Sequence, residues 1–335
     1  MAEVFRLTKG YEPELWAAVH SDQVLALMLP VRISLMSSFL LRHLSARSIV
    51  FGSVLVAPGP TAHEALSQLL TIYSKENRGR SLFTELRNLT DLQTLQPLLQ
   101  RFKFGYQEHL NYLIDLARPK ETLFRDIGSR TRKNIRHALN QGRVQVELIT
   151  EKPRLAACYA ILSQTYQNAS VPLADKSLFE AAYDVLAPKG MVRFAIASVN
   201  GTPAAATVEL VYKDVIFGWY GGVVRKFSSY VPNEILTWEV LKWGAENGYR
   251  LYDFGGAGRP DERYGVRDFK AKFGGRLVNY GRNTCVHSAF RFHLSKFGYK
   301  VLRSLLFGGR KRPVLLTADQ QDVSAGPPLF TKDIM

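Results

Sequence analysis

The chain of 335 residues is 46% hydrophobic and 22% charged, so it can bury a large core, and its length favours two domains or one duplicated unit. Its 44 Lys and Arg residues against 29 Asp and Glu give a net charge of +15 at pH 7, which points to a phosphate-bearing partner such as nucleic acid, an anionic membrane surface or a phosphorylated substrate. The two cysteines, Cys158 and Cys285, are too few for a disulfide framework or a zinc site and favour a reducing, cytoplasmic location.

The first elements predicted along the chain lie in its most apolar early stretch, residues 24–41, which reads as a buried strand followed by a helix. Pro30 and Arg32 interrupt the stretch and argue against a membrane span. Residues 1–16 lack the apolar centre of a signal peptide. We therefore expect a cytoplasmic protein.

The same order of elements occurs twice, in residues 48–86 and 215–256: an apolar strand, a turn, an amphipathic helix, an Asn/Gly stop and a second strand. In the second copy, Pro232 marks the start of the helix. A strand–helix–strand unit favours a right-handed crossover onto a mixed sheet. The repeat therefore predicts an α/β (α+β) fold of two tandem domains, each a mixed sheet flanked by helices.

Between the two copies, residues 123–141 predict one helix that ends at Gly142, before an alternating strand at 144–149. We place the start of the second domain near Pro119. The predicted domains are residues 1–118, completed by the C-terminal segment 280–335, and residues 119–279.

The predicted linking helix is strongly basic, with Asp126 as its single acid. At about 100° per residue, Arg125, Arg132 and Arg136 fall on one stripe, where their charges add. Such a stripe suits phosphate groups of a donor or acceptor, although an ordinary solvated helix face has the same pattern.

The C-terminal region is also basic, with nine Lys and Arg residues and no Asp or Glu between residues 276 and 312. It carries an apolar stripe at helical spacing, formed by Phe290, Leu294, Phe297, Val301 and Leu305. This combination is typical of an interfacial helix and predicts peripheral contact of residues 288–312 with the inner face of the membrane. A helix docked on the core has the same pattern.

Residues 252–275, YDFGGAGRPDERYGVRDFKAKFGG, resemble the FemAB family of peptidyltransferases. The segments SRTRKNIRHALNQG (129–142) and GTPAAATVELVYKDVIFGWYGG (201–222) resemble other parts of that family in the same order. The resemblance implies two tandem GNAT-like acyltransferase domains that add amino acids to cell-wall precursors. A Walker A motif, a GxSxG motif and a metal-ligand spacing are absent, so we expect chemistry without a metal, a covalent nucleophile or a bound cofactor.

The FK-x-x-FG pattern of the family matches Phe269, Lys270, Phe273 and Gly274, and it implies that Lys270 faces the reaction centre. Acyl transfer to an amine builds negative charge on the carbonyl oxygen, which a fixed ammonium group can stabilise. We expect Phe269 and Phe273 to flank the lysine and exclude water. A lysine at the protein surface is the alternative.

Three further residues are candidates for the site. Asp253 ends the strand expected beside the VIFGWYGG strand; it either orients or deprotonates the amine, or fixes the Gly255–Gly256 turn. Tyr220 either binds substrate or packs in the core. Lys176 is a candidate phosphate ligand.

The prediction is therefore a FemAB-like acyltransferase that moves an aminoacyl group from aminoacyl-tRNA, or a related acyl group, to an amine of a lipid-linked or nucleotide-linked cell-wall precursor. One alternative is an acyl-CoA-dependent N-acyltransferase acting on a sugar or exopolysaccharide precursor, although the usual Gly-rich loop for the CoA diphosphate is not visible at residues 223–236. Another is a non-catalytic protein that binds nucleic acid or membranes on the same scaffold.

Overall fold

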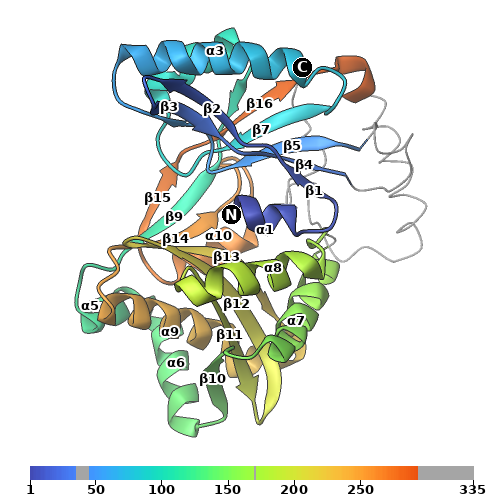
Figure 1. Cartoon of the computed structure of the whole chain (residues 1–335). Coiled ribbons are helices and arrows are strands. Elements are labelled where there is room, and N and C mark those ends of the chain that lie inside the picture. The colour runs from blue at the N-terminus through green and yellow to red at the C-terminus, as the bar shows by residue number, and fades with distance from the viewer. Residues whose placement is uncertain (35–44, 170, 293–335) are drawn as a thin grey trace. The chain divides into compact units, whose positions relative to one another are not determined.

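The computed structural model describes residues 1–34, 45–169 and 171–292, and it divides into two compact units (Figure 1). Among the described residues, unit 1 comprises residues 1–109 and 279–292, and unit 2 comprises residues 110–278. Each unit has its own large mixed sheet and its own hydrophobic core. The expected fold of two mixed sheets flanked by helices is confirmed.

Unit 1 is built mainly from strands, with one long helix. Its elements in chain order are α1 (Ala2–Arg6), β1 (Tyr11–Pro13), β2 (Trp16–His20), β3 (Gln23–Met28), β4 (Pro30–Ile33), β5 (Arg47–Phe51), β6 (Leu55–Val56), α3 (Pro60–Glu76), β7 (Phe83–Arg87), α4 (Gln96–Arg101), β8 (Gly105–Gln107) and β16 (Arg282–Val286). The large sheet has the order β1-β4-β5-β7-β16-β8, and β2-β3-β6 form a small second sheet.

Helix α3 connects β5 to β7, which pair in parallel. Leu66, Leu70 and Tyr73 of α3 are buried and pack with residues of the sheet, including Val50 and Leu86. The predicted strand at the start of residues 24–41 is present as β3 and β4. The helix expected after it falls on residues 35–44, which lie outside the described residues.

Unit 2 contains most of the helices that the structure describes. Its elements are β9 (Leu110–Asp115), α5 (Lys120–Asp126), α6 (Ser129–Gln141), β10 (Val144–Leu148), α7 (Leu155–Asn168), α8 (Lys176–Leu186), β11 (Val192–Val199), β12 (Thr202–Tyr212), β13 (Val215–Val223), α9 (Pro232–Glu246), β14 (Leu251–Gly256), α10 (Gly265–Ala271) and β15 (Arg276–Asn279). They form a sheet with the order β10-β11-β12-β13-β14-β9-β15.

The predicted repeat is confirmed, because unit 2 reuses the connection seen in unit 1. Helix α9 begins at Pro232, as predicted, and joins β13 to β14, which again pair in parallel. Strand β9 pairs with β14, so the sheet of unit 2 recruits residues from Leu110 onward, nine positions before Pro119. Strand β16 from the C-terminal part of the chain pairs with both β7 and β8.

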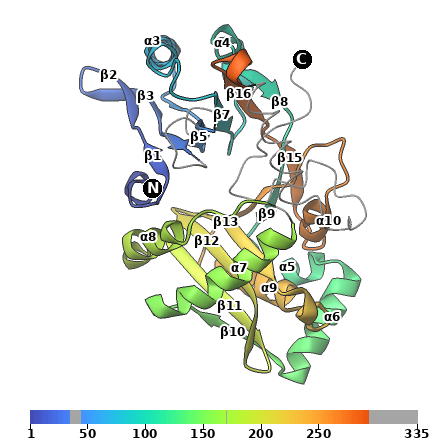
Figure 2. The ribbon, with the colours of Figure 1, turned by 90° about the vertical axis from the view of Figure 1, so that its right-hand side faces the viewer.

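Helices cover both faces of the unit 2 sheet (Figure 2). The guanidinium group of Arg193 lies 3.2 Å from the ring centre of Trp243 in α9, whereas the next residue, Phe194, contacts Tyr183 of α8. Successive side chains of a strand point to opposite faces. Helices α8 and α9 therefore pack on opposite faces, which explains why β11 is almost continuously buried.

The prediction of one linking helix is wrong, because the chain forms two helices, α5 and α6, in its place. Ile127 and Gly128 between them have extended backbone. The buried side chain of Ile127 and a hydrogen bond of 2.8 Å from Gly128 N to Lys272 O hold this break. Arg125 is therefore not on one helical stripe with Arg132 and Arg136. The stop at Gly142 is confirmed, with this residue in the left-handed region.

The expected C-terminal helix falls largely on residues that the structure does not describe, because the description ends at Phe292. Of its predicted apolar stripe, only Phe290 is described, and its side chain is 79% exposed.

Candidate functional site

Strands β13 and β14 pair over only a few residues and then separate. Their parallel register runs from Val215 and Leu251 to Phe217 and Asp253, although β13 continues to Val223 and β14 to Gly256. The adjacency predicted for Asp253 and the VIFGWYGG strand is thus confirmed. Beyond Phe217 the ladder to β14 ends, so the rest of β13 is not paired with β14.

The separation coincides with a bulge in β14. On the other side of β14, Asp253 pairs with Leu113 and Gly256 with Asn111, so two residues of β14 face a single residue of β9. Gly255 lies in the bulge with φ of +70°, a conformation that favours glycine. At this bulge the carbonyl groups of Phe254 and Gly256, on either side of Gly255, leave the regular hydrogen-bond ladder between β14 and β9.

Asp253 holds the bulge in place. Its carboxylate Oδ1 accepts a hydrogen bond of 2.7 Å from Gly255 N, as the turn-fixing alternative requires, and one of 3.4 Å from the side-chain amide of Asn111. Burial raises the pKa of Asp253 to about 6, and the hydrogen bond from Gly255 and the charge of Lys270 partly offset that rise. Asp253 therefore titrates near neutrality, which is the range useful for proton transfer.

Lys270 reaches the bulge from α10. Its side chain is 6% exposed, and Nζ donates hydrogen bonds of 2.5 Å to Phe254 O and 2.6 Å to Gly256 O, the carbonyl groups on either side of Gly255. The predicted surface-lysine alternative is therefore wrong. The bulge and α10 together place a buried ammonium group at the end of β14, where β13 and β14 separate.

Aromatic side chains surround this part of unit 2. The ring centre of Phe254 lies 5.7 Å from Lys270 Nζ, and Phe273 packs between Phe254 and Phe269 with ring-centre distances of 5.8 and 5.3 Å. Phe273 is buried, whereas Phe269 is partly exposed. Such rings limit the access of water and so strengthen electrostatic interactions of the ammonium group.

Tyr220 lies on β13 in an aromatic cluster with residues of α7 and α8. Its ring centre is 4.7 Å from that of Phe179 and 6.0 Å from that of Tyr166, and the side chain is 3% exposed. These contacts match the core-packing alternative for Tyr220. The helices α7 and α8 thus cover β13 where it runs past the end of its pairing with β14.

Sequence reasoning missed a buried carboxyl group at Glu209 of β12. Glu209 pairs across the sheet with Arg193 and with Gly218, the first β13 residue beyond the pairing with β14. Thr207 donates a hydrogen bond to its Oε1, while the buried Oε2 has no hydrogen-bond partner among the described residues. Burial raises the pKa of Glu209 to about 7. Only the alternation of apolar residues around it, in TVELVY, could have indicated that the position is inside.

The arginines predicted as a phosphate-binding stripe have local partners. Arg132 donates hydrogen bonds to the carbonyl oxygens of Arg125 and, at 3.0 Å, Ile127, at the C-terminal end of α5. Arg136 lies 5.0 Å from the ring centre of Phe124, and Arg125 donates to the Thr122 hydroxyl. Arg132 therefore supports the α5–α6 break, because the last carbonyl groups of a helix lack partners within it.

We expect Arg132→Ala to lower the free energy of unfolding by about 1–3 kcal/mol, the range for losing hydrogen bonds from a charged donor. Chemical denaturation of the purified protein would measure this change. Arg130→Ala on the same helix is the matched control, since Arg130 is exposed, and it should shift the free energy by less than about 0.5 kcal/mol. Equal stability of the two variants would contradict this role of Arg132.

Lys176, the other predicted phosphate ligand, is the first residue of α8. Its ammonium group is exposed and forms an ion pair of 2.7 Å with Glu180 one turn later. The carboxylate of Glu180 therefore offsets much of the positive charge of Lys176 that would attract a phosphate.

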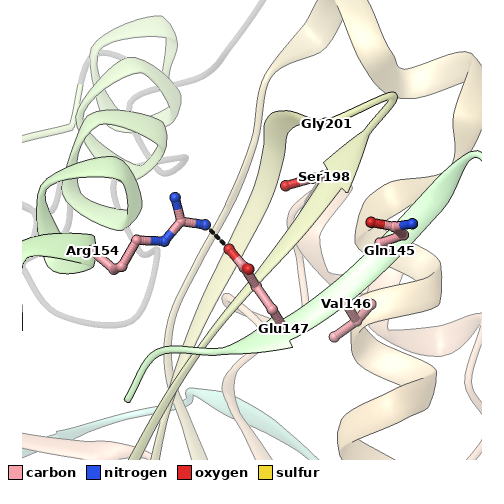
Figure 3. A pocket seen from close by; sticks show the side chains of 6 residues that line it. All are labelled: Gln145, Val146, Glu147, Arg154, Ser198 and Gly201. Atoms are coloured by element: carbon pink, nitrogen blue, oxygen red, sulfur yellow. Dashed lines mark ion pairs between the residues drawn. The ribbon is translucent and has the colours of Figure 1, made fainter. Parts of the chain in front are cut away.

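A separate hollow of about 510 Å³ lies at the other edge of the unit 2 sheet (Figure 3). It is lined by residues of β10 and β11 and by Arg154, which forms an ion pair with Glu147. Strands β11, β12 and β13 separate β10 from β14, so the hollow is not part of the Lys270 site. Within residues 1–34, 45–169 and 171–292, no group of His, Cys, Asp and Glu could hold a metal ion, and no helix has the length and apolarity to cross a membrane.

Comparison with known proteins agrees with this geometry. Residues 125–270 match the family model described as an acetyltransferase (GNAT) domain, whereas no curated protein matches the sequence. The structure of FemX superposes with a TM-score of 0.63 at 15% identity, covering 90% of this chain and 92% of that one.

Two further solved structures have the same fold. L-PGS from Bacillus licheniformis matches with a TM-score of 0.53 at 13% identity, covering 89% of this chain and 90% of that one. A tandem GNAT protein from the clavulanic acid biosynthesis pathway matches with a TM-score of 0.54 at 9% identity, covering 84% and 85%. The resemblance drawn from the sequence is thereby confirmed for the fold.

Proposed function

We propose that this acyltransferase, a protein of two tandem GNAT-like domains, moves an aminoacyl group from aminoacyl-tRNA to an amine of a lipid-linked or nucleotide-linked cell-wall precursor. The observation that carries the proposal is the buried ammonium group of Lys270, held by Phe254 O and Gly256 O where β13 and β14 separate. The fold shared with FemX supports acyl transfer on this scaffold, and the proposed substrates are those that the sequence resemblance to the FemAB family implies.

The position of Lys270 suits a reaction in which an oxyanion forms. The amine nitrogen of the acceptor attacks the carbonyl carbon of the aminoacyl ester, and the electron pair of the C=O bond moves onto oxygen. When the carbonyl re-forms, the C–O bond to the ribose breaks. An ammonium group fixed in a site of low dielectric stabilises the intermediate oxyanion without reorganising.

Asp253 supplies a group that can take up the proton lost by the amine. Its pKa of about 6 leaves it mostly ionised at pH 7, yet close enough to neutrality to pass the proton on to the departing ribose oxygen. In this proposal, its hydrogen bond from Gly255 also keeps the two carbonyl groups directed at Lys270. Asp253 thus links the shape of the bulge to proton transfer.

A second candidate is transfer from an acyl-CoA, since residues 125–270 match the acetyltransferase (GNAT) family model. The chemistry at Lys270 would be the same, with a thiolate leaving in place of the ribose oxygen. The two functions differ in how the donor is recognised.

The donor can be identified directly. Isotope-labelled alanyl-, glycyl- and seryl-tRNA would be incubated with the protein beside labelled acetyl-CoA, with lipid-linked and nucleotide-linked muropeptide precursors as acceptors. We expect label to pass from at least one aminoacyl-tRNA to the precursor. Transfer from acetyl-CoA alone would contradict the proposal and favour the second candidate, and no transfer from any of these donors would contradict both.

A further inference from the structure

Helix α6 has an outer face that is positively charged and contains no acid. It packs against α9 and β10 (Figure 1). Only Ile135 and Ala138 of the helix are buried. From Ser129 to Arg143 the sequence contains no Asp or Glu. Arg130, Lys133 and His137 lie on the side of the helix opposite Ile135, and all three are exposed.

Arg130 and Lys133 have no ion-pair partner among the described residues, unlike several other exposed cations of unit 2. Lys176 pairs with Glu180 on α8 and Lys242 with Glu239 on α9. Within the part of the chain that the structure describes, no acid lies within ion-pair distance of Arg130 or Lys133.

The acids nearest to α6 in the sequence are already engaged. Asp126 accepts a hydrogen bond of 2.7 Å from Arg118, and Glu147 pairs with Arg154. The charge of α6 is therefore left for an external partner.

The structure also separates these cations from the arginines with internal contacts. Arg132 holds carbonyl groups at the end of α5, and Arg136 lies over the ring of Phe124. Arg130 and Lys133 have no such contact. Arg130 lies in the first turn of α6 and Lys133 begins the second, so the partial positive charge of the helix N-terminus adds most to the charge of Arg130. The cations of α6 without an internal contact are therefore Arg130 and Lys133, which adds them to the arginines that the sequence pattern indicated as phosphate ligands.

The polar side chains beside the cations favour a nucleic acid over a membrane. Asn134, Asn140 and Gln141 are exposed on α6 and can donate to and accept from ribose and base edges. An interfacial helix needs an exposed apolar face, whereas the buried residues of α6 face α9 and β10, and Leu139 alone is an exposed large hydrophobic residue on this helix.

We propose that the outer face of α6, centred on Arg130 and Lys133, binds the phosphodiester backbone of an RNA. This inference rests on the proposed function only for the identity of that RNA, the body of the aminoacyl-tRNA donor. Binding through phosphate contacts is largely independent of sequence and falls steeply with salt. The surface would then hold the RNA while its acylated end reaches Lys270.

The test compares two double variants with the same change in net charge. Arg130→Glu with Lys133→Glu reverses the charge on α6. Both positions are exposed, and an acid at position 130 in the first turn favours helix formation, so this variant should fold. Lys189→Glu with Lys213→Glu is the matched control at exposed positions elsewhere in unit 2. Filter binding of deacylated tRNA would be measured for the parent and both variants between 50 and 200 mM salt, a range in which phosphate contacts weaken strongly.

We expect the α6 variant to weaken tRNA binding by about tenfold or more and to reduce the slope of log affinity against log salt by roughly 1.5, the contribution of two phosphate contacts. The control should bind within about threefold of the parent. Equal losses in both variants, no loss in the α6 variant, or no binding by the parent would overturn the proposal.

Two outcomes separate this proposal from neighbouring ones. Sedimentation with phosphatidylglycerol-containing vesicles would identify α6 as a membrane contact if the α6 variant lost vesicle binding and kept tRNA binding, which would also overturn the proposal. Deacylated tRNA carries no group to transfer, so binding is measured apart from the reaction. A parent that binds tRNA through α6 but transfers only from acetyl-CoA would leave the RNA surface standing and contradict the proposed donor.

Discussion

Lys270→Met is expected to lower kcat by about 10² to 10³-fold, the range measured when a single oxyanion-stabilising donor is removed. Methionine has nearly the length of lysine and packs readily, but it carries no charge. Because the ammonium group would act on the oxyanion and not on the neutral ester, KM should change by less than about threefold. Steady-state transfer assays with the donor identified as above would measure both constants.

The matched control is Lys272→Met, two positions along the chain from Lys270. Lys272 is exposed and forms an ion pair of 3.1 Å with Glu234, so its loss should leave kcat nearly unchanged. Removing Lys270 leaves Phe254 O and Gly256 O without this donor, at a cost of about 1–3 kcal/mol, so rates must be referred to the folded fraction. Near-normal kcat of folded Lys270→Met would remove Lys270 from the mechanism.

Glu209→Gln should make the protein more stable at pH 8 while changing little at pH 4.5. Burial raises the pKa of Glu209 from 4.5 to about 7, so between these pH values the folded state holds a proton that the unfolded state has released. The stabilisation is complete below pH 4.5 and is lost as the pH rises through 7. The pKa difference corresponds to a loss of roughly 3 kcal/mol in the free energy of unfolding of the parent protein at high pH. The glutamine variant would not show this loss, because glutamine is neutral at every pH.

Urea denaturation of parent and variant between pH 4.5 and 8 would measure this difference. Subtracting the two stability curves isolates the contribution of Glu209, because the other titrating groups are the same in both proteins. Asp253 has a raised pKa and, like Glu209, makes stability fall as the pH rises. Burial lowers the pKa of His287 to about 4, which makes stability rise with pH instead. Arg193, directly across from Glu209, lowers its pKa and is present in both proteins. Glu147→Gln, at an exposed ion pair, is the control and should show no comparable trend. A flat difference curve for Glu209→Gln would show that the pKa of Glu209 is the same in the folded and unfolded states.

Glu209 also bears on the site, because it faces Gly218 where β13 leaves β14. A Cβ atom at Gly218 would lie 2.7 Å from the hydroxyl of Tyr252, so glycine here leaves room for that side chain. Burial, with a smaller contribution from Glu209, raises the pKa of Tyr252 well above its usual value. Buried polar groups thus lie at the point where the sheet opens.

Local sequence patterns were enough to predict several features of the fold. Apolar periodicity and turn residues predicted the duplicated strand–helix–strand unit, the start of α9 at Pro232 and the end of α6 at Gly142. These signals act within a few residues, since proline and glycine restrict or extend the backbone wherever they stand. The resemblance of RDFKAKFGG to the FemAB family indicated Lys270 as a site residue without any information on its contacts.

The surroundings of each of these residues depend on long-range packing, which local patterns do not encode. The break between α5 and α6 depends on a hydrogen bond to Lys272 O, which is more than 140 positions away. The carbonyl groups that accept hydrogen bonds from Lys270 lie at a bulge in the pairing of β14 with β9. Likewise, Glu209 is buried because α9 covers its strand, and a propensity scale cannot report such long-range packing. A pattern can place a charge on a helix, but the free energy of that charge depends on which distant groups fold against it, which is why Arg132 became structural and Arg130 remained available to a partner.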